Sequence, residues 1–132
     1  MIRKAKQGDL NNIYKLIKLG SEDGQVLLRS KKELKNVLKY FFVAHEENKI
    51  VGCASLEVYS PKLAEIRSLV VLKEYRKSGI GTKLVKRCLR EARKQNVYEV
   101  LSITDRIEFF NRFGFFNQLS GQSPLFKRLK KR

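Results

Sequence analysis

The segment from Glu65 to Gly81 places an apolar strand, a short basic turn and the start of a long helix directly after one another. The turn reads Arg76-Lys77-Ser78-Gly79-Ile80-Gly81. The first N–H groups of a helix lack backbone partners and lie at the positive end of its dipole, so they bind anions. Glycines at positions 79 and 81 let a ligand approach the backbone closely, because no Cβ is in the way. The segment therefore predicts a cradle for a phosphate or pyrophosphate.

The periodicity of apolar residues predicts the other elements. Helices are expected after Asp9, after Ser30, from Gly79 to Gln95 and from Arg106 to Phe113. Strands are expected at residues 1–6, 41–45, 50–59, 63–72 and 98–103, and again from Phe115 onward. This order predicts an α/β (α+β) fold, in which a mixed central sheet carries helices on both faces. We expect one domain over residues 1–132, with a basic C-terminal tail at 127–132.

The chain is strongly basic. Its 132 residues carry a formal net charge of +16, which favours anionic partners such as nucleic acid or a small acidic ligand. The N-terminus has no signal-peptide pattern, and no apolar run approaches the roughly 18 residues of a membrane span, so we expect a cytoplasmic protein. Cys53 and Cys88 lack the spacing of a metal site and are interpreted as reduced core residues, so no metal is expected.

The cradle residues match a known signature. Arg76-Lys77-Ser78-Gly79-Ile80-Gly81 resembles the Arg/Gln-x-x-Gly-x-Gly/Ala acetyl-CoA motif of the GNAT acetyltransferase superfamily, and Phe113-Gly114-Phe115 resembles its closing motif. The resemblance implies acetyl-CoA as cosubstrate and a mostly antiparallel sheet that splays at the acetyl-CoA site. It also implies that residues 76–82, including Thr82, hold the pyrophosphate. The pantetheine arm would pair with exposed backbone at Leu69, Val70 and Val71.

A narrower resemblance covers several further segments. They are similar to the acetyltransferase domain of N-acetylglutamate synthases, and they include Val26-Leu27-Leu28-Arg29-Ser30, Val51-Gly52-Cys53-Ala54-Ser55-Leu56, Ala64-Glu65-Ile66-Arg67-Ser68-Leu69 and Glu108-Phe109-Phe110. This similarity implies acetyl transfer to the α-amine of glutamate by direct transfer in a ternary complex, the first step of arginine biosynthesis.

Four residues are candidates for the acceptor chemistry. Glu65 is a carboxylate in an apolar strand, placed as in family members that use a glutamate there as general base. The alternative is a surface strand residue, paired with Arg67. Arg29 is a candidate to bind a substrate carboxylate, because guanidinium and carboxylate match bidentately, and Arg67 and Arg106 are further candidates for that task.

One position departs from the family. Many members have a tyrosine four residues before the glycine of the closing motif, to protonate the thiolate, and this chain has Phe110. Two alternatives to an amino-acid acetyltransferase therefore stay open. One is a GNAT enzyme for another amine, either a protein N-terminus or a small amine. The other is a non-catalytic module that binds CoA or nucleic acid. A nucleic-acid partner is possible but not favoured, and a homodimer is possible.

Overall fold

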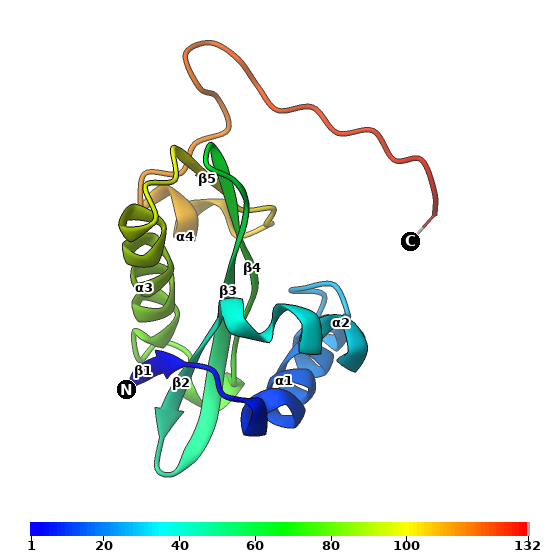
Figure 1. The fold of residues 1–132 in the computed structure, drawn as a ribbon, viewed down its shortest axis with the longest axis vertical. Coiled ribbons are helices and arrows are strands. Elements are labelled where there is room, and N and C mark those ends of the chain that lie inside the picture. The colour runs from blue at the N-terminus through cyan, green and yellow to red at the C-terminus, as the bar shows by residue number, and fades with distance from the viewer. Residues whose placement is uncertain (132) are drawn as a thin grey trace.

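The computed structural model describes residues 1–131, which form a sheet of five strands and four α-helices (Figure 1). The strands are β1 (Ile2–Lys4), β2 (Phe41–Glu46), β3 (Lys49–Ser60), β4 (Leu63–Val71) and β5 (Glu99–Leu101). The helices are α1 (Leu10–Glu22), α2 (Lys31–Val37), α3 (Ile80–Lys94) and α4 (Ile107–Asn111). Short 3-10 turns lie at Gln7–Asp9 (η1), Leu38–Tyr40 (η2) and Lys73–Tyr75 (η3).

The sheet follows chain order, β1-β2-β3-β4-β5. The first three pairings are antiparallel, and β4 pairs with β5 in parallel, which requires the crossover through α3. The expected mixed, mostly antiparallel sheet is confirmed.

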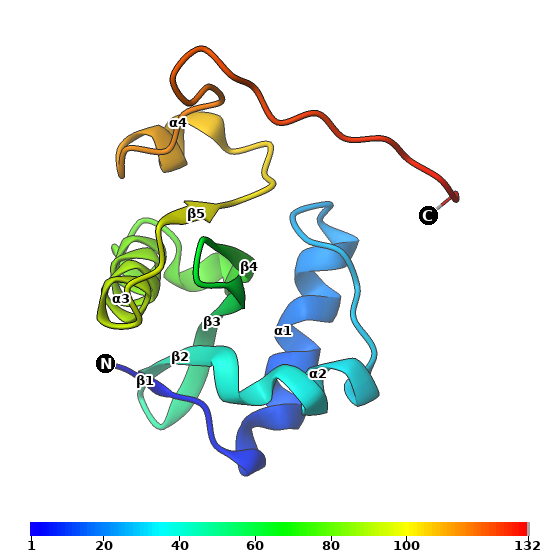
Figure 2. The same ribbon diagram turned by 45° about the horizontal axis from the view of Figure 1, so that its top comes forward.

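Helices cover both faces of the sheet, as Figures 1 and 2 show together. On one face, Ile13, Leu16 and Ile17 of α1 and Leu34 of α2 pack against buried residues of β2, β3 and β4. On the other face, α3 packs its buried side, including Leu84 and Val85, together with Phe110 of α4. The apolar side of α1 therefore builds one core and the apolar side of α3 builds the other.

The pairing of β4 with β5 is short. It joins Leu63 to Glu99, Ala64 to Val100 and Glu65 to Leu101, and no further ladder pair of these strands exists among residues 1–131. Ser102 Oγ still donates to the Ile66 carbonyl at 3.2 Å, and then the chain departs towards α4. The second half of β4, from Leu69 to Val71, is therefore left without a strand on its β5 side.

An irregularity marks the same stretch on the β3 side of β4. The register shifts between Cys53 and Ser55, and Ser68 takes a positive φ of 56°. A bulge of this kind bends a strand and redirects its side chains. It divides β4 into a half that pairs on both sides and a half that leads to the turn at 76–81.

The strand expected from Phe115 onward is wrong for the residues described. The segment up to residue 131 contains only an isolated bridge between Leu119 and Gln122, around a turn with positive φ at Ser120 and Gly121. Leu125, Phe126 and Leu129 beyond it are between 74% and 91% exposed, so no apolar contact holds them against the sheet. No helix of residues 1–131 has the length and hydrophobicity needed to cross a membrane.

Candidate active site

The cradle expected at residues 76–82 is a turn followed by the first turn of α3. Lys77 and Gly79 both have positive φ, 73° and 86°, and Gly79 is the residue that precedes the helix. Within residues 1–131 no side chain caps this helix start, so its first N–H groups remain available to a ligand. A Cβ at Gly79 would meet nothing within 4 Å, so open space lies beside the residue that precedes the helix.

Three contacts hold the cradle in place. Arg76 donates from Nε to the carbonyl of Val71 at 3.0 Å and pairs with Asp23 at 3.4 Å, which ties the turn to the end of β4 and to the end of α1. Ser78 Oγ donates to the Tyr75 carbonyl, and Ile80 is buried in the core. The cradle is therefore a fixed feature of the fold, with an uncapped helix start and free space, and these properties fit a pyrophosphate.

The unpaired half of β4 leads into this cradle. Val70 is buried towards α1, while Arg106 donates to the Leu69 carbonyl at 3.4 Å from the other side of the gap left by β5. Although Arg106 as a residue is exposed, partial burial lowers the pKa of its guanidinium, and Arg76 nearby lowers it further. It also lies 5.8 Å from the centre of the Phe109 ring.

Glu65 lies on the last pair of the β4–β5 ladder, where the two strands separate. Its paired residue on the neighbouring strand β3 is Glu57, and Glu65 itself is half-buried. Its Oε1 accepts a hydrogen bond from Tyr59 Oη at 2.5 Å, and it makes no ion pair within residues 1–131. Burial and this hydrogen bond raise the pKa of Tyr59 to about 12, so its phenol stays protonated and keeps donating. The alternative pairing with Arg67 does not occur.

Arg29 is buried, at 3% exposed, and its guanidinium is held by internal partners. It forms a bidentate pair with Glu57, at 2.8 and 3.0 Å, and also donates to Glu33 and to Ser68. Four of its five N–H groups are thereby used. Burial opposes the charge of Glu57, but hydrogen bonds from Arg29 and Ser55 outweigh it and hold the pKa of Glu57 below its usual value.

Arg67 completes this network from β4. It lies 3.4 Å from Glu57 and its side chain remains 30% exposed, so it extends beyond the buried pair. The predicted residues are therefore brought together in two groups. Arg29 and Arg67 are linked through Glu57 of β3, Glu65 contacts Tyr59 of the same strand, and the cradle lies at the far end of β4.

Sequence reasoning missed Tyr59, Glu57 and Ser55. All three alternate along β3, and the hairpin turn at 61–62 sets their register against Glu65 and Arg67. An alternating polar series of this kind in a strand that is otherwise apolar is a signal that could have pointed to them.

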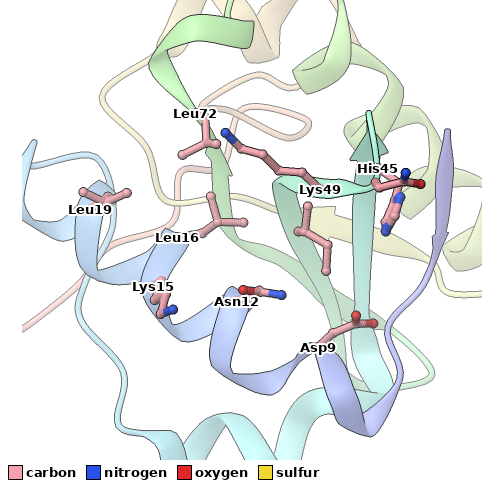
Figure 3. A pocket seen from close by; sticks show the side chains of 10 residues that line it. Asp9, Asn12, Lys15, Leu16, Leu19, His45, Lys49 and Leu72 are labelled. Atoms are coloured by element: carbon pink, nitrogen blue, oxygen red, sulfur yellow. The ribbon is translucent and has the colours of Figure 1, made fainter.

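A hollow of about 490 Å³ lies elsewhere, between α1 and the β2–β3 hairpin (Figure 3). Leu16, Leu19 and Leu72 form its apolar side, and Lys49 and His45 lie on its hairpin side. None of residues 76–82 lines this hollow, so it lies apart from the candidate acetyl-CoA site. Among residues 1–131 no cluster of His, Cys, Asp and Glu is arranged to hold a metal ion. Burial raises the pKa of Cys53 and of Cys88 to about 12, so neither is a nucleophile.

Comparison with known proteins gives the family. Residues 10–115 match the acetyltransferase (GNAT) family model. An uncharacterized N-acetyltransferase of Chlorobaculum tepidum is 35% identical over 114 residues, which is 86% of this chain and 74% of that protein. An amino-acid acetyltransferase of Shewanella oneidensis is 29% identical over 86% of this chain, but the chain spans only 26% of its length.

Solved structures agree. A protein of Mycobacterium tuberculosis in complex with CoA has a TM-score of 0.85 at 30% identity, covering 90% of this chain and 73% of that one. N-acetylglutamate synthase of Neisseria gonorrhoeae, in complex with coenzyme A and N-acetyl-glutamate, has a TM-score of 0.81 at 27% identity, covering 86% of this chain and 27% of that one. With its strand, cradle and helix in the expected arrangement, the chain belongs to the GNAT family of acetyltransferases, which use acetyl-CoA as cosubstrate.

Proposed function

We propose that this chain transfers the acetyl group of acetyl-CoA to the α-amine of an acidic amino acid, with glutamate as the first candidate. The observation that carries the proposal is the position of Glu65. It is a half-buried carboxylate free of ion pairs among residues 1–131, at the point where β4 and β5 separate, with arginine side chains on the same strand and across the gap.

The donor would bind along β4 and the cradle. The uncapped N–H groups at the start of α3 would hold the pyrophosphate, and Lys77 and Thr82 lie beside them. The backbone at Leu69–Val71, which has no strand partner on the β5 side, would receive the pantetheine arm. This places the thioester near the separation of the strands, on the side towards Glu65.

In the proposed reaction, Glu65 takes a proton from the ammonium of the acceptor, directly or through one water. The neutral amine then attacks the thioester carbonyl. As the amide bond forms and the carbon–sulfur bond breaks, the attacking nitrogen loses one further proton, which neutralises the departing CoA thiolate directly or through water. Tyr59 holds one oxygen of Glu65 at 2.5 Å and leaves the other for the substrate. Phe110 is buried and has no hydroxyl, so protonation of the thiolate falls to another group or to water.

Recognition of the acceptor carboxylates is proposed for Arg67 and Arg106. Arg67 is partly exposed and only loosely paired, and Arg106 makes no ion pair with a carboxylate of residues 1–131. Arg29, with four N–H groups already used, would act mainly by holding Glu57, which in turn orients Arg67. The relatives named amino-acid acetyltransferases support an amino-acid acceptor.

The test is release of free thiol from acetyl-CoA in the presence of glutamate, glutamine and a glutamate whose α-carboxyl is amidated. Turnover with glutamate that falls strongly for the amidated compound supports the proposal. Arg67→Gln should raise the KM for glutamate by about 10-fold or more, since a hydrogen bond to a charged group is worth about 1.5–3 kcal/mol. Lys32→Gln, an exposed position on α2, is the control. If no amino acid is acetylated while CoA still stabilises the protein, the acceptor assignment is wrong.

A further inference from the structure

The outer face of α3 carries a row of cations. The exposed residues are Lys83, Lys86, Arg90, Arg93 and Lys94, which we call the α3 cation row. At 3.6 residues per turn they lie within an arc of about 100°, over a rise of about 17 Å. Figures 1 and 2 show α3 along one side of the molecule, across the sheet from α1 and α2.

These cations are not neutralised by ion pairs within the part of the chain that the structure describes. No ion pair within residues 1–131 includes a member of the row. The one acidic residue of α3 is Glu91, which lies beside the row and accepts a hydrogen bond from Gln95 at 2.9 Å. The hydrogen bond from Gln95 and, with it, the nearby charge of Lys94 lower the pKa of Glu91, so the positive charge of the other four members of the row is left to solvent or to a ligand.

The stability of the helix does not explain this placement. Lys83 and Lys86 are three apart, Lys86 and Arg90 are four apart, and Arg90 and Arg93 are three apart, so like charges meet at each step and destabilise the helix. Cations near a helix C-terminus interact favourably with the helix dipole, which explains the cations in the last turn of α3. The same dipole disfavours Lys83 near the N-terminus, so an external anion is the better explanation of the complete row.

The cradle cannot account for the far half of the row either. Arg90 lies 11 residues beyond Gly79, a rise of about 17 Å along the axis, and Arg93 and Lys94 lie further still. An anion that contacts these residues is a second ligand, or a long one. Within residues 80–94, all of which the structure describes, no large apolar side chain is exposed. The row therefore offers neither an apolar anchor for a membrane nor an aromatic platform for unstacked bases.

We propose that the α3 cation row binds the phosphate backbone of a nucleic-acid duplex, without reading its sequence. A line of lysines and arginines supplies phosphate contacts, which give affinity and salt dependence but carry no base information. The net charge of +16 would attract the duplex to the protein, and the row would fix where it lies. This inference does not depend on the acceptor of the acetyl group.

The experiment measures the anisotropy of a fluorescein-labelled 24-base-pair DNA duplex, titrated with the full chain at several salt concentrations. The variant is Arg90→Ala/Arg93→Ala/Lys94→Ala, which spares the residues nearest the cradle. The matched control is Lys18→Ala/Lys32→Ala/Lys35→Ala, which removes the same charge from exposed positions on α1 and α2. The CoA-induced thermal shift of each variant checks that it is folded.

Each lost phosphate contact should make the slope of log affinity against log salt shallower by about 0.9. The slope of the triple α3 variant should therefore be shallower than that of the wild type by about 2–3. The control should keep the wild-type slope, and saturating CoA should leave DNA binding in place. Equal losses in both variants would show a response to total charge and overturn the proposal. Loss of DNA binding in the presence of saturating CoA would also overturn the proposal. Tighter binding to phosphatidylserine vesicles than to DNA would overturn it as well. Single Arg90→Gln and Lys18→Gln variants repeat the comparison if a triple variant fails to fold.

Discussion

Replacing Gly81 with aspartate, and with alanine as its matched control, should separate the stability of this protein from its binding of CoA. Gly81 is the second residue of α3, and its φ is not positive. An added Cβ would meet Phe109 at 3.6 Å and Val71 at 3.9 Å, both ordinary contacts. Alanine is about 0.5–1 kcal/mol better than glycine in a helix. We therefore expect Gly81→Ala to unfold at the wild-type temperature or slightly above it. Its methyl group should leave CoA binding nearly unchanged, because it would lie against Phe109 and Val71 and because the acetyl-CoA motif accepts alanine at this position. An aspartate at the same position adds a negative charge beside the N–H groups proposed to hold the pyrophosphate.

The size of the effect follows from linkage. At 100 times its dissociation constant, a ligand stabilises the folded state by about 2.7 kcal/mol. If an added carboxylate weakens CoA binding 10-fold, the stabilisation at the same concentration falls to about 1.4 kcal/mol, so the CoA-induced shift in Tm is halved. Gly81→Asp should therefore lose at least half of the shift, because its carboxylate repels the phosphates, whereas Gly81→Ala should keep it.

The assay is thermal unfolding with and without CoA, supported by calorimetric titration. Gly8→Ala is the control, since nothing lies within 4 Å of its Cβ position and η1 is far from the cradle in sequence. Gly79→Ala is a contrasting variant. The φ of 86° at Gly79 makes any side chain strained, so this variant should lose stability even without ligand. If Gly81→Asp is folded and binds CoA as tightly as Gly81→Ala and the wild type, the cradle is not the pyrophosphate site.

Three further predictions concern the acceptor side. Glu65→Gln should lower kcat by about 10²-fold while the CoA-induced Tm shift is kept, and steady-state kinetics that show a change of only a few fold would remove Glu65 from the mechanism. Tyr59→Phe removes the hydrogen bond that orients Glu65, worth about 1 kcal/mol, so kcat should fall about 5-fold, whereas Tyr98→Phe, at an exposed site, should match the wild type. The folded-state pKa of Glu57 is lowered, so its contribution to stability is present above its unfolded pKa and is lost as the pH falls through the folded value. Glu57→Gln leaves Arg29 buried without its main partner, so it should lower the free energy of unfolding in urea by about 3 kcal/mol near neutral pH. It should also flatten the dependence of that free energy on acid pH. If the pH dependence of stability is unchanged, the ion-pair account is contradicted.

The sequence by itself determined the features that are local along the chain. The strand, the turn with Gly79 and the start of α3 follow one another within 17 residues, so their order alone brings the helix N-terminus to the end of β4. The apolar residues of α1 and α3 recur with the 3.6-residue period of a helix, so they lie on one side of each helix, and this side is the buried one. The family resemblance rested on the same local segments.

The acceptor side depended on contacts that sequence spacing does not reveal. Arg29 and Glu57 are 28 residues apart, and their pairing follows from how the chain after α1 lies over β3. Tyr59 reaches Glu65 because the hairpin sets the register of β3 against β4, and a shift of one residue would turn the two side chains to opposite faces. The sequence alone therefore suggested Arg29 as a free ligand for substrate, whereas the fold uses most of its donors internally.

The segment after Phe115 gives a second example of a prediction that local sequence alone could not decide. Phe115 and the apolar residues that follow suggested a strand, but a strand is stable only when another strand supplies its hydrogen bonds and a core covers its face. In the structure neither is provided between Phe116 and residue 131, and Phe126 stays 74% exposed. Local pattern determines which elements a segment is able to form, and tertiary contacts decide which of them form and which polar side chains remain free for chemistry.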